Sequence, residues 1–193
     1  MSDSYHHGNL RQALIDAGVR IINERGEEGL SLRGVAAACG VSHAAPYAHF
    51  RDKNDLVESI KKSIEMQFTD ELSSAVLQES NAESALIAMG RSYVSFFIRK
   101  PDYFKFLFGG NNLIAHLRPG VDYDGDYQPF ALLKNTYRRY LKEKNLNKND
   151  DEQEMDILKL WASAHGLASL ACMSGVKVSF DWEEKLASGE LLK

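Results

Sequence analysis

The spacing of apolar residues is the feature that most constrains the fold of this chain of 193 residues. Apolar side chains recur every three or four positions, as in Leu56, Ile60, Ile64, Phe68 and Leu72. A strand would instead need alternation of apolar and polar residues, and such alternation of β-branched residues is nearly absent. Because residues three and four apart share one face of a helix, the sequence predicts an all-α fold.

Capping and breaking residues divide this pattern into segments. Ser31, Ser42 and Asp52 stand where side-chain N-caps are expected, whereas Gly26 and Gly40 end the segments that precede them. We predict helices over residues 9–25, 32–39, 43–50, 53–78, 82–99, 101–108, 128–145 and 151–174, a short helix within 181–192, and a loop over 118–127.

Composition excludes several classes of protein. No apolar run reaches the ~18 residues that a membrane span needs, and the first residues lack a secretory signal, so we expect a cytoplasmic protein without a membrane partner. Cys39 and Cys172 lie far apart, and we find no metal-ligand spacing, phosphate-binding loop or nucleophile with a neighbouring base. We therefore expect no metal and no cofactor, and an enzyme is the weaker hypothesis.

The segment "GVSHAAPYAHFRDKNDL", residues 40–56, indicates where function lies. Two short helices separated by a Gly-Val-Ser turn have the form of a helix-turn-helix, whose second helix enters the major groove of DNA. Pro46 falls in the first turn of that second helix, where its missing N–H costs little. The net charge of −4 gives no support for general nucleic-acid binding, so any contact with DNA must be local.

These residues also resemble the N-terminal DNA-binding domain of the tetracycline-repressor (TetR) family. The matching pattern covers roughly the first quarter to third of the chain and consists of Ser31, Val35-Ala36, Gly40-Val41-Ser42, Tyr47, His49-Phe50, Lys53 and Leu56. The resemblance implies a homodimeric regulator, normally a repressor, that binds an inverted-repeat operator in double-stranded DNA. It further implies release of that operator when a small molecule occupies the C-terminal part. We expect a helix-turn-helix domain over 1–52 and a ligand-sensing and dimerisation domain over 53–193.

The resemblance assigns contacts to individual residues. Arg33 and His43 would reach base edges, and small Ala44 would let the backbone approach the groove. Phosphate contacts fall to Ser31, Tyr47, His49 and Lys53, while Ser42 caps the recognition helix. Structural alternatives remain open: Tyr47 could be a core aromatic residue like Phe50, His49 a structural histidine, and Lys53 a solvated lysine without a partner in DNA.

The second half of the chain offers candidates for a ligand site. An aromatic cluster there is either plain core or the wall of a cavity for an apolar or aromatic effector. Trp161 and His165 lie one turn apart in a Trp-x-x-x-His-Gly run, which is similar to one in a subgroup of TetR C-terminal domains. The candidate ligand residues are Phe97, Tyr103, Phe104, Phe108, Trp161 and His165.

Small residues on the same helix predict a close contact with another helix. Ala164, Ala168, Ala171 and Gly175 recur at spacings of four, three and four. They suit either packing within the subunit or a dimer seam, and we favour the seam because two half-sites require two recognition helices. The alternative function is a constitutive DNA-binding protein whose C-terminal domain is structural only.

Overall fold

The computed structural model describes residues 10–109, 116–118 and 127–192. All regular elements in these ranges are helical, as the sequence predicts. They are α1 (Leu10–Arg25), the 3₁₀ turn η2 (Glu27–Gly29), α2 (Leu32–Ala38), the 3₁₀ turn η3 (Ala45–Ala48), α3 (Lys53–Leu77), α4 (Ala82–Arg99), α5 (Pro101–Phe108), α6 (Gln128–Glu143), α7 (Asp150–Cys172) and α8 (Trp182–Ala187).

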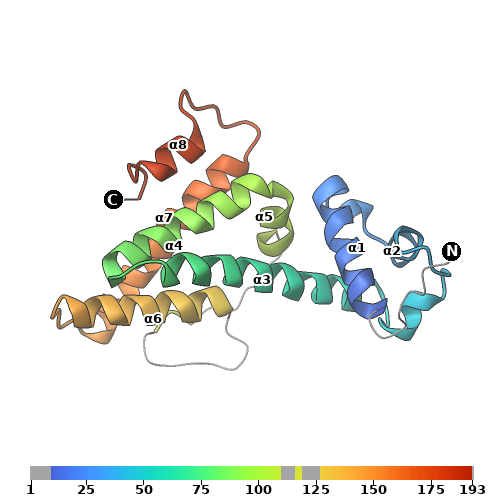
Figure 1. Ribbon diagram of the computed structural model, residues 1–193, viewed down its shortest axis with the longest axis horizontal. Coiled ribbons are helices and arrows are strands. Elements are labelled where there is room, and N and C mark those ends of the chain that lie inside the picture. The colour runs from blue at the N-terminus through green and yellow to red at the C-terminus, as the bar shows by residue number, and fades with distance from the viewer. Residues whose placement is uncertain (1–9, 110–115, 119–126, 193) are drawn as a thin grey trace.

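The long helix α3 connects two groups of helices. In Figure 1, α1, α2 and η3 gather around its beginning, and α4, α6 and α7 lie along its further part. Near its start, Ile60 lies so close to α1 that a Cβ on Gly18 would fall 2.3 Å from Ile60 Cδ1. Further along, the ring of Phe68 packs against Tyr93 and Phe97 of α4, with centroids 5.0 and 4.9 Å apart. A displacement of α3 therefore reaches both groups.

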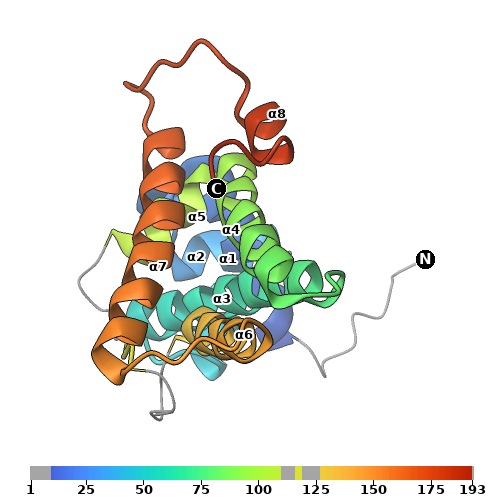
Figure 2. The ribbon, with the colours of Figure 1, turned by 90° about the vertical axis from the view of Figure 1, so that its left-hand side faces the viewer.

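Helix α4 packs against α3, α6 and α7, and Figure 2 shows it beside α7 and above α6. Its buried residues include Phe96 and Phe97, which are 1% and 0% exposed. Tyr103 of α5 is also buried and lies 6.0 Å from Phe96 between ring centroids. This part of the aromatic cluster is core, which is one of the two alternatives that its sequence left open.

Helices α2 and α3 begin at the predicted capping residues. Ser31 Oγ accepts a hydrogen bond from the backbone N–H of Gly34 at 2.9 Å, and Asp52 Oδ1 accepts one from Asp55 at 2.9 Å. An oxygen at this position satisfies an N–H that the helix itself leaves unpaired. Both predicted caps are confirmed.

The predicted helix over 43–50 is wrong, since only the four residues of η3 form a helical turn there. Ala44 is its N-cap and makes no side-chain cap bond, whereas the Ser42 carbonyl accepts from the N–H of Ala45 at 3.0 Å. The predicted capping role of the Ser42 side chain is therefore also wrong. Pro46 donates no N–H, and its carbonyl accepts from both His49 and Phe50 at 2.9 Å, which closes the turn tightly.

The C-terminal segment crosses α4. Ser95 donates a hydrogen bond to Glu183 Oε2 of α8 at 2.9 Å, and Leu186 is buried. Gly189, at a φ of +73°, turns the chain after α8. Leu192 then approaches α4 so closely that a Cβ on Gly90 would lie 3.2 Å from its Cδ1. Residues 191–192 thus pack against the middle of α4.

Most of the loop predicted over 118–127 lies outside the described residues. Among the helices of the described ranges, none combines the length and apolarity that crossing a bilayer requires.

Candidate DNA-binding surface and ligand pocket

The seven predicted DNA-contacting residues come from adjoining elements at one end of the molecule. Ser31 precedes α2, Arg33 lies in its first turn, and His43 and Ala44 form the turn before η3. Tyr47 belongs to η3, His49 follows it, and Lys53 begins α3. His49 is half-buried. The other six are exposed: Ser31, Arg33, His43, Ala44, Tyr47 and Lys53.

The exposure of Tyr47 and Phe50 separates a surface role from a core role. Tyr47 is 58% exposed, so its interpretation as a core aromatic residue is wrong, whereas Phe50 is 1% exposed and belongs to the core. The guanidinium of Arg11 lies 5.2 Å from the centre of the Phe50 ring, and the His49 ring packs edge-on against it at 6.5 Å. Phe50 therefore anchors the segment that presents Tyr47 to solvent.

One hydroxyl group and one ammonium group at helix starts suit phosphate oxygens. The cap bond uses Ser31 Oγ as an acceptor and leaves the hydroxyl proton available to donate. Lys53 is the first residue of α3, where the helix dipole favours an anion. Lys53 also borders an open polar groove, together with Glu24 of α1 and Glu28 of η2.

A further cation, Arg51, was not among the predicted contacts. Its side chain is 88% exposed between η3 and α3, and its Nε lies 3.4 Å from Asp55 Oδ2. Hydrogen bonds from Arg51 lower the pKa of Asp55, whose carboxylate holds the guanidinium beside the start of α3. Its exposure beside η3 makes Arg51 a further candidate for a phosphate contact, and the sequence pattern alone does not report that exposure.

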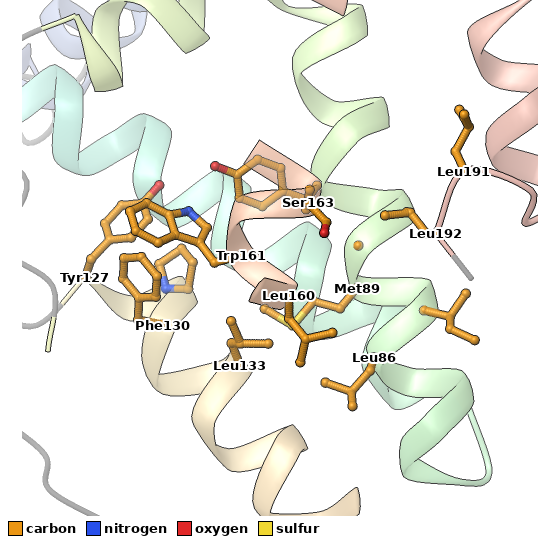
Figure 3. A pocket seen from close by; sticks show the side chains of 15 residues that line it. Leu86, Met89, Tyr127, Phe130, Leu133, Leu160, Trp161, Ser163, Leu191 and Leu192 are labelled. Carbon is orange, nitrogen blue, oxygen red and sulfur yellow. The ribbon is translucent and has the colours of Figure 1, made fainter. Parts of the chain in front are cut away.

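The C-terminal helices border an apolar pocket of about 190 Å³ that is partly open to solvent (Figure 3). It lies between α4, the start of α6, α7 and the C-terminal segment. The lining residues are Leu86, Ile87, Met89, Gly90, Tyr93, Tyr127, Pro129, Phe130, Leu133, Leu160, Trp161, Ser163, Ala164, Leu191 and Leu192.

Of the six predicted ligand residues, only Trp161 lines this pocket. Phe97 and Tyr103 are buried in the core, and the rings of Phe104 and Phe108 pack against His165 at 5.0 and 4.8 Å. The cluster on α5 fills the interior next to the pocket instead of forming its wall. These five residues do not line this pocket, and their role in ligand binding stays a prediction.

The residues that the prediction missed differ in their sequence signal. Phe130 and Leu133 follow helical spacing at the start of α6, and Tyr127 precedes them, so this face was open to sequence reasoning. Leu191 and Leu192 carried no such signal, because their place depends on the turn at Gly189.

His165 has a structural partner. Its Nδ1 lies 2.8 Å from the hydroxyl of Tyr93. Burial lowers the pKa of His165 and raises that of Tyr93, so this hydrogen bond joins a neutral imidazole to a neutral phenol. This is the structural interpretation of His165, which the sequence had left beside a role in ligand binding.

The edge of the pocket is tied to α3. The backbone N–H of Gln128, at the start of α6, donates to Glu65 Oε1 of α3 at 3.2 Å. Burial raises the pKa of Glu65. The neighbouring residue Tyr127 has a buried hydroxyl without a hydrogen-bond partner among the described residues.

The small residues of α7 do not all face outward. Ala164 and Ala168 are 5% and 0% exposed, because this face of α7 packs on α4. These two residues therefore pack within the subunit, and the predicted seam does not lie on them. Ala171 is half-buried and Gly175 is exposed beyond the helix end.

The outward face of α7 carries larger apolar side chains. Met155, Leu158, Leu170 and Met173 are 39–51% exposed, and Ala162 and Gly166 lie between them at helical spacing. The step from Ala164 to Gly166 turns the helix by about 200°, to its opposite side. Among the helices drawn in Figure 2, none covers this side of α7.

An exposed helix-turn-helix joined by one long helix to a helical bundle with an apolar pocket defines a class of DNA-binding transcriptional regulators. The family described as "Bacterial regulatory proteins, tetR family" matches residues 14–60, and the family described as "Tetracyclin repressor-like, C-terminal domain" matches residues 86–188. The second match covers more than half of the chain. The chain belongs to the TetR family.

Individual proteins agree with this assignment. The chain is 24% identical over 181 residues to the HTH-type transcriptional regulator PksA of Bacillus subtilis, covering 94% of this chain and 87% of PksA. Over 50 residues, 26% of this chain and 23% of the relative, it is 40% identical to the regulator AcrR of Shigella flexneri.

Solved structures share the fold. A protein of unknown function from Rhodococcus sp. RHA1 superposes with a TM-score of 0.78 at 28% identity, covering 98% of this chain and 96% of that one. AibR, solved in complex with isovaleryl coenzyme A and operator DNA, superposes with a TM-score of 0.59 at 18% identity over 94% and 95% of the two chains.

Proposed function

We propose that this protein is a homodimeric repressor that binds an inverted-repeat operator and releases it when a small molecule occupies the pocket. The exposure of the predicted contact residues at the helix-turn-helix is the observation that carries the DNA-binding part. In this proposal Arg33 and His43 contact base edges, and the phosphate contacts belong to Ser31, Tyr47, His49 and Lys53. Residues 1–52 form the DNA-binding domain, and 53–193 the sensing and dimerisation domain.

The uncovered apolar face of α7 supports the dimer. A two-fold symmetric contact would place the same face of both subunits together, with Leu158 and Leu170 buried in the seam. Large exposed apolar side chains along a helix, separated by Ala162 and Gly166, allow close approach of a second copy. Dimerisation supplies the two recognition elements that an inverted repeat needs, about 34 Å apart.

The pocket and its link to α3 support the sensing part. A ligand beside Tyr127 and Phe130 would displace the start of α6, which Gln128 ties to Glu65 of α3. Since α3 begins at Lys53, this displacement would change the spacing of the two recognition elements. That AibR, a neighbour in fold, was solved with isovaleryl coenzyme A and operator DNA agrees with ligand control in this fold.

Within the family, we propose that the chain belongs to the subgroup with the Trp-x-x-x-His-Gly run. Support comes from the distinct positions of its members here: Trp161 borders the pocket, and His165 hydrogen-bonds Tyr93 behind it.

Selection of random duplex DNA by the full-length protein, followed by salt titration of the recovered sequences, tests the DNA-binding part. We expect an inverted repeat. Lys53→Ala should weaken binding to all sequences and flatten the salt dependence by about one unit, whereas His43→Ala should mainly change the preferred bases. Enrichment of no sequence, with weak binding at every salt concentration, would contradict the proposal.

A constitutive DNA-binding protein is the alternative outcome. It would bind the same repeat with an affinity that no pocket ligand changes.

A further inference from the structure

We propose that Arg51 binds a phosphate of the operator backbone through the two terminal amino groups of its guanidinium. This inference rests on the DNA binding proposed above and adds a contact outside the seven residues predicted from the sequence. Because the backbone phosphates carry no base information, the contact would add affinity and register without base preference.

Arg51 lies within the segment that carries other proposed phosphate contacts. His49 precedes it by two residues and Lys53 follows it by two, so all three lie between the end of η3 and the first residue of α3. In Figure 1 this connection is at the end of the molecule that carries α1 and α2, away from α6 and α8. The side chain is 88% exposed there, so the guanidinium can meet a DNA backbone without a rearrangement of the protein.

The guanidinium is oriented through one of its three nitrogen atoms. Its Nε lies 3.4 Å from Asp55 Oδ2, and the same oxygen accepts the backbone N–H of Arg51 at 3.1 Å. The N–H of Asp55 is in turn held by Asp52 Oδ1 at 2.9 Å. Within the part of the chain that the structure describes, these bonds leave both terminal amino groups of Arg51 with their donors unused. Such a fork of parallel N–H groups matches two oxygens of one phosphate.

The carboxylate of Asp55 does not cancel the positive charge at this corner. Hydrogen bonds from Arg51, together with the charge of Arg11, hold the pKa of Asp55 below its usual range, so the carboxylate is ionised. One carboxylate therefore interacts with two guanidinium groups, and Arg11 is itself tied to α3 by a bond of 2.8 Å to Ser59 Oγ. An exposed ion pair such as that of Arg51 and Asp55 is weak, so a phosphate competes successfully for the guanidinium.

The salt dependence of DNA binding measures the number of phosphate contacts. Full-length Arg51→Ala and the unmodified protein are compared on the inverted repeat recovered from random DNA. At about 0.1 M salt the variant should bind about tenfold more weakly, because a hydrogen-bonded charge pair is lost. The slope of log affinity against log salt concentration should flatten by about one unit for each bound subunit.

Arg139→Ala is the matched control. Arg139 of α6 pairs with Glu143 at the same sequence spacing, with its Nε 3.2 Å from Glu143 Oε1, but it lies in the C-terminal group of helices. This variant removes the same charge from the protein and should leave both the affinity and the slope unchanged. Circular dichroism should show the same helical content for both variants and the unmodified protein, since both ion pairs are exposed.

Two further measurements separate a direct contact from a general effect of charge. Arg51→Lys keeps the charge but lacks the fork, so it should keep the slope and bind a few-fold more weakly than the unmodified protein. Phosphates of the repeat are also replaced one at a time by uncharged methylphosphonates. We expect one position in each half-site at which this replacement weakens the unmodified protein about tenfold and Arg51→Ala not at all.

Four outcomes would overturn the inference. They are an unchanged slope in Arg51→Ala, an equal change in Arg139→Ala, an affinity of Arg51→Lys equal to that of the unmodified protein, and equal sensitivity of the unmodified protein and Arg51→Ala to every methylphosphonate.

The same salt titration on duplex DNA of random sequence distinguishes this inference from the proposed function, because phosphate contacts do not depend on base sequence. A slope that Arg51→Ala flattens there, although no repeat is selected, supports the contact and refutes the sequence-specific operator. Selection of a repeat whose salt slope Arg51→Ala leaves unchanged overturns the contact and leaves operator binding standing. A protein that binds neither DNA refutes both.

Discussion

The exposed face of α7 makes a quantitative prediction about dimerisation. Leu170 is 45% exposed, and complete burial of a leucine side chain is worth roughly 2 kcal/mol. Burying the exposed remainder in a seam contributes about 1 kcal/mol for each copy, or about 2 kcal/mol for the symmetric pair. Leu170→Glu removes this contribution and also places two carboxylates in an apolar contact, each of which costs further free energy. We expect a total loss of at least about 4 kcal/mol, which raises the dimer dissociation constant about 1000-fold.

Sedimentation velocity over a range of concentrations measures that constant. Leu77→Glu is the matched control, because Leu77 is 84% exposed at the end of α3 and does not lie on α7. Both variants should keep the helical content of the unmodified protein. Leu170→Glu should also lose cooperative binding to a two-half-site operator.

Two results would refute the reasoning. A Leu170→Glu protein that dimerises as tightly as the unmodified chain would show that the seam lies elsewhere. Equal disruption by Leu77→Glu would show that the effect comes from added charge and not from the face of α7.

Three further predictions concern single groups. Burial lowers the pKa of His165 in the folded protein, so the unfolded chain takes up the proton first as the pH falls. The unfolding temperature should therefore be constant above about pH 6.5 and fall toward pH 5.5. His165→Asn should flatten this pH dependence, and an unfolding temperature that falls equally steeply in the variant would contradict the prediction. In urea unfolding at pH 7, Glu65→Gln should retain or raise stability, because it keeps an acceptor for the N–H of Gln128 without the buried charge. Glu65→Leu should cost about 1 kcal/mol of stability. Equal losses in the two variants would argue against a contribution from the bond between Gln128 and Glu65. Ser31→Ala should cost about 1 kcal/mol of stability, whereas Ser31→Asp should keep the cap and weaken operator binding by repelling phosphate; unchanged operator binding by Ser31→Asp would remove Ser31 from the phosphate contacts.

The sequence predicted best what depends on local interactions. Helix starts at Ser31 and Asp52 follow from side-chain oxygens that bond N–H groups three residues away. The buried face of α3 follows from its spacing, with Leu56, Ile60 and Phe68 all 0% exposed. The short η3 was harder, because a serine, small residues and a proline satisfy the rules for a helix start as well as those for a single turn.

The pocket and the outer face of α7 depend on which helix covers which, and local patterns do not contain that information. Ala164 and Gly166 are both small residues of one helix, yet α4 covers the first and leaves the second on the open side. The aromatic cluster likewise divides by partner: Phe97 meets Phe68 in the core, whereas Phe130 meets Trp161 at the cavity. Residues 191–192 reach the pocket only because Gly189 turns the chain back toward α4. A change at Gly189 that straightens this turn should therefore alter ligand size preference without touching any residue that contacts DNA.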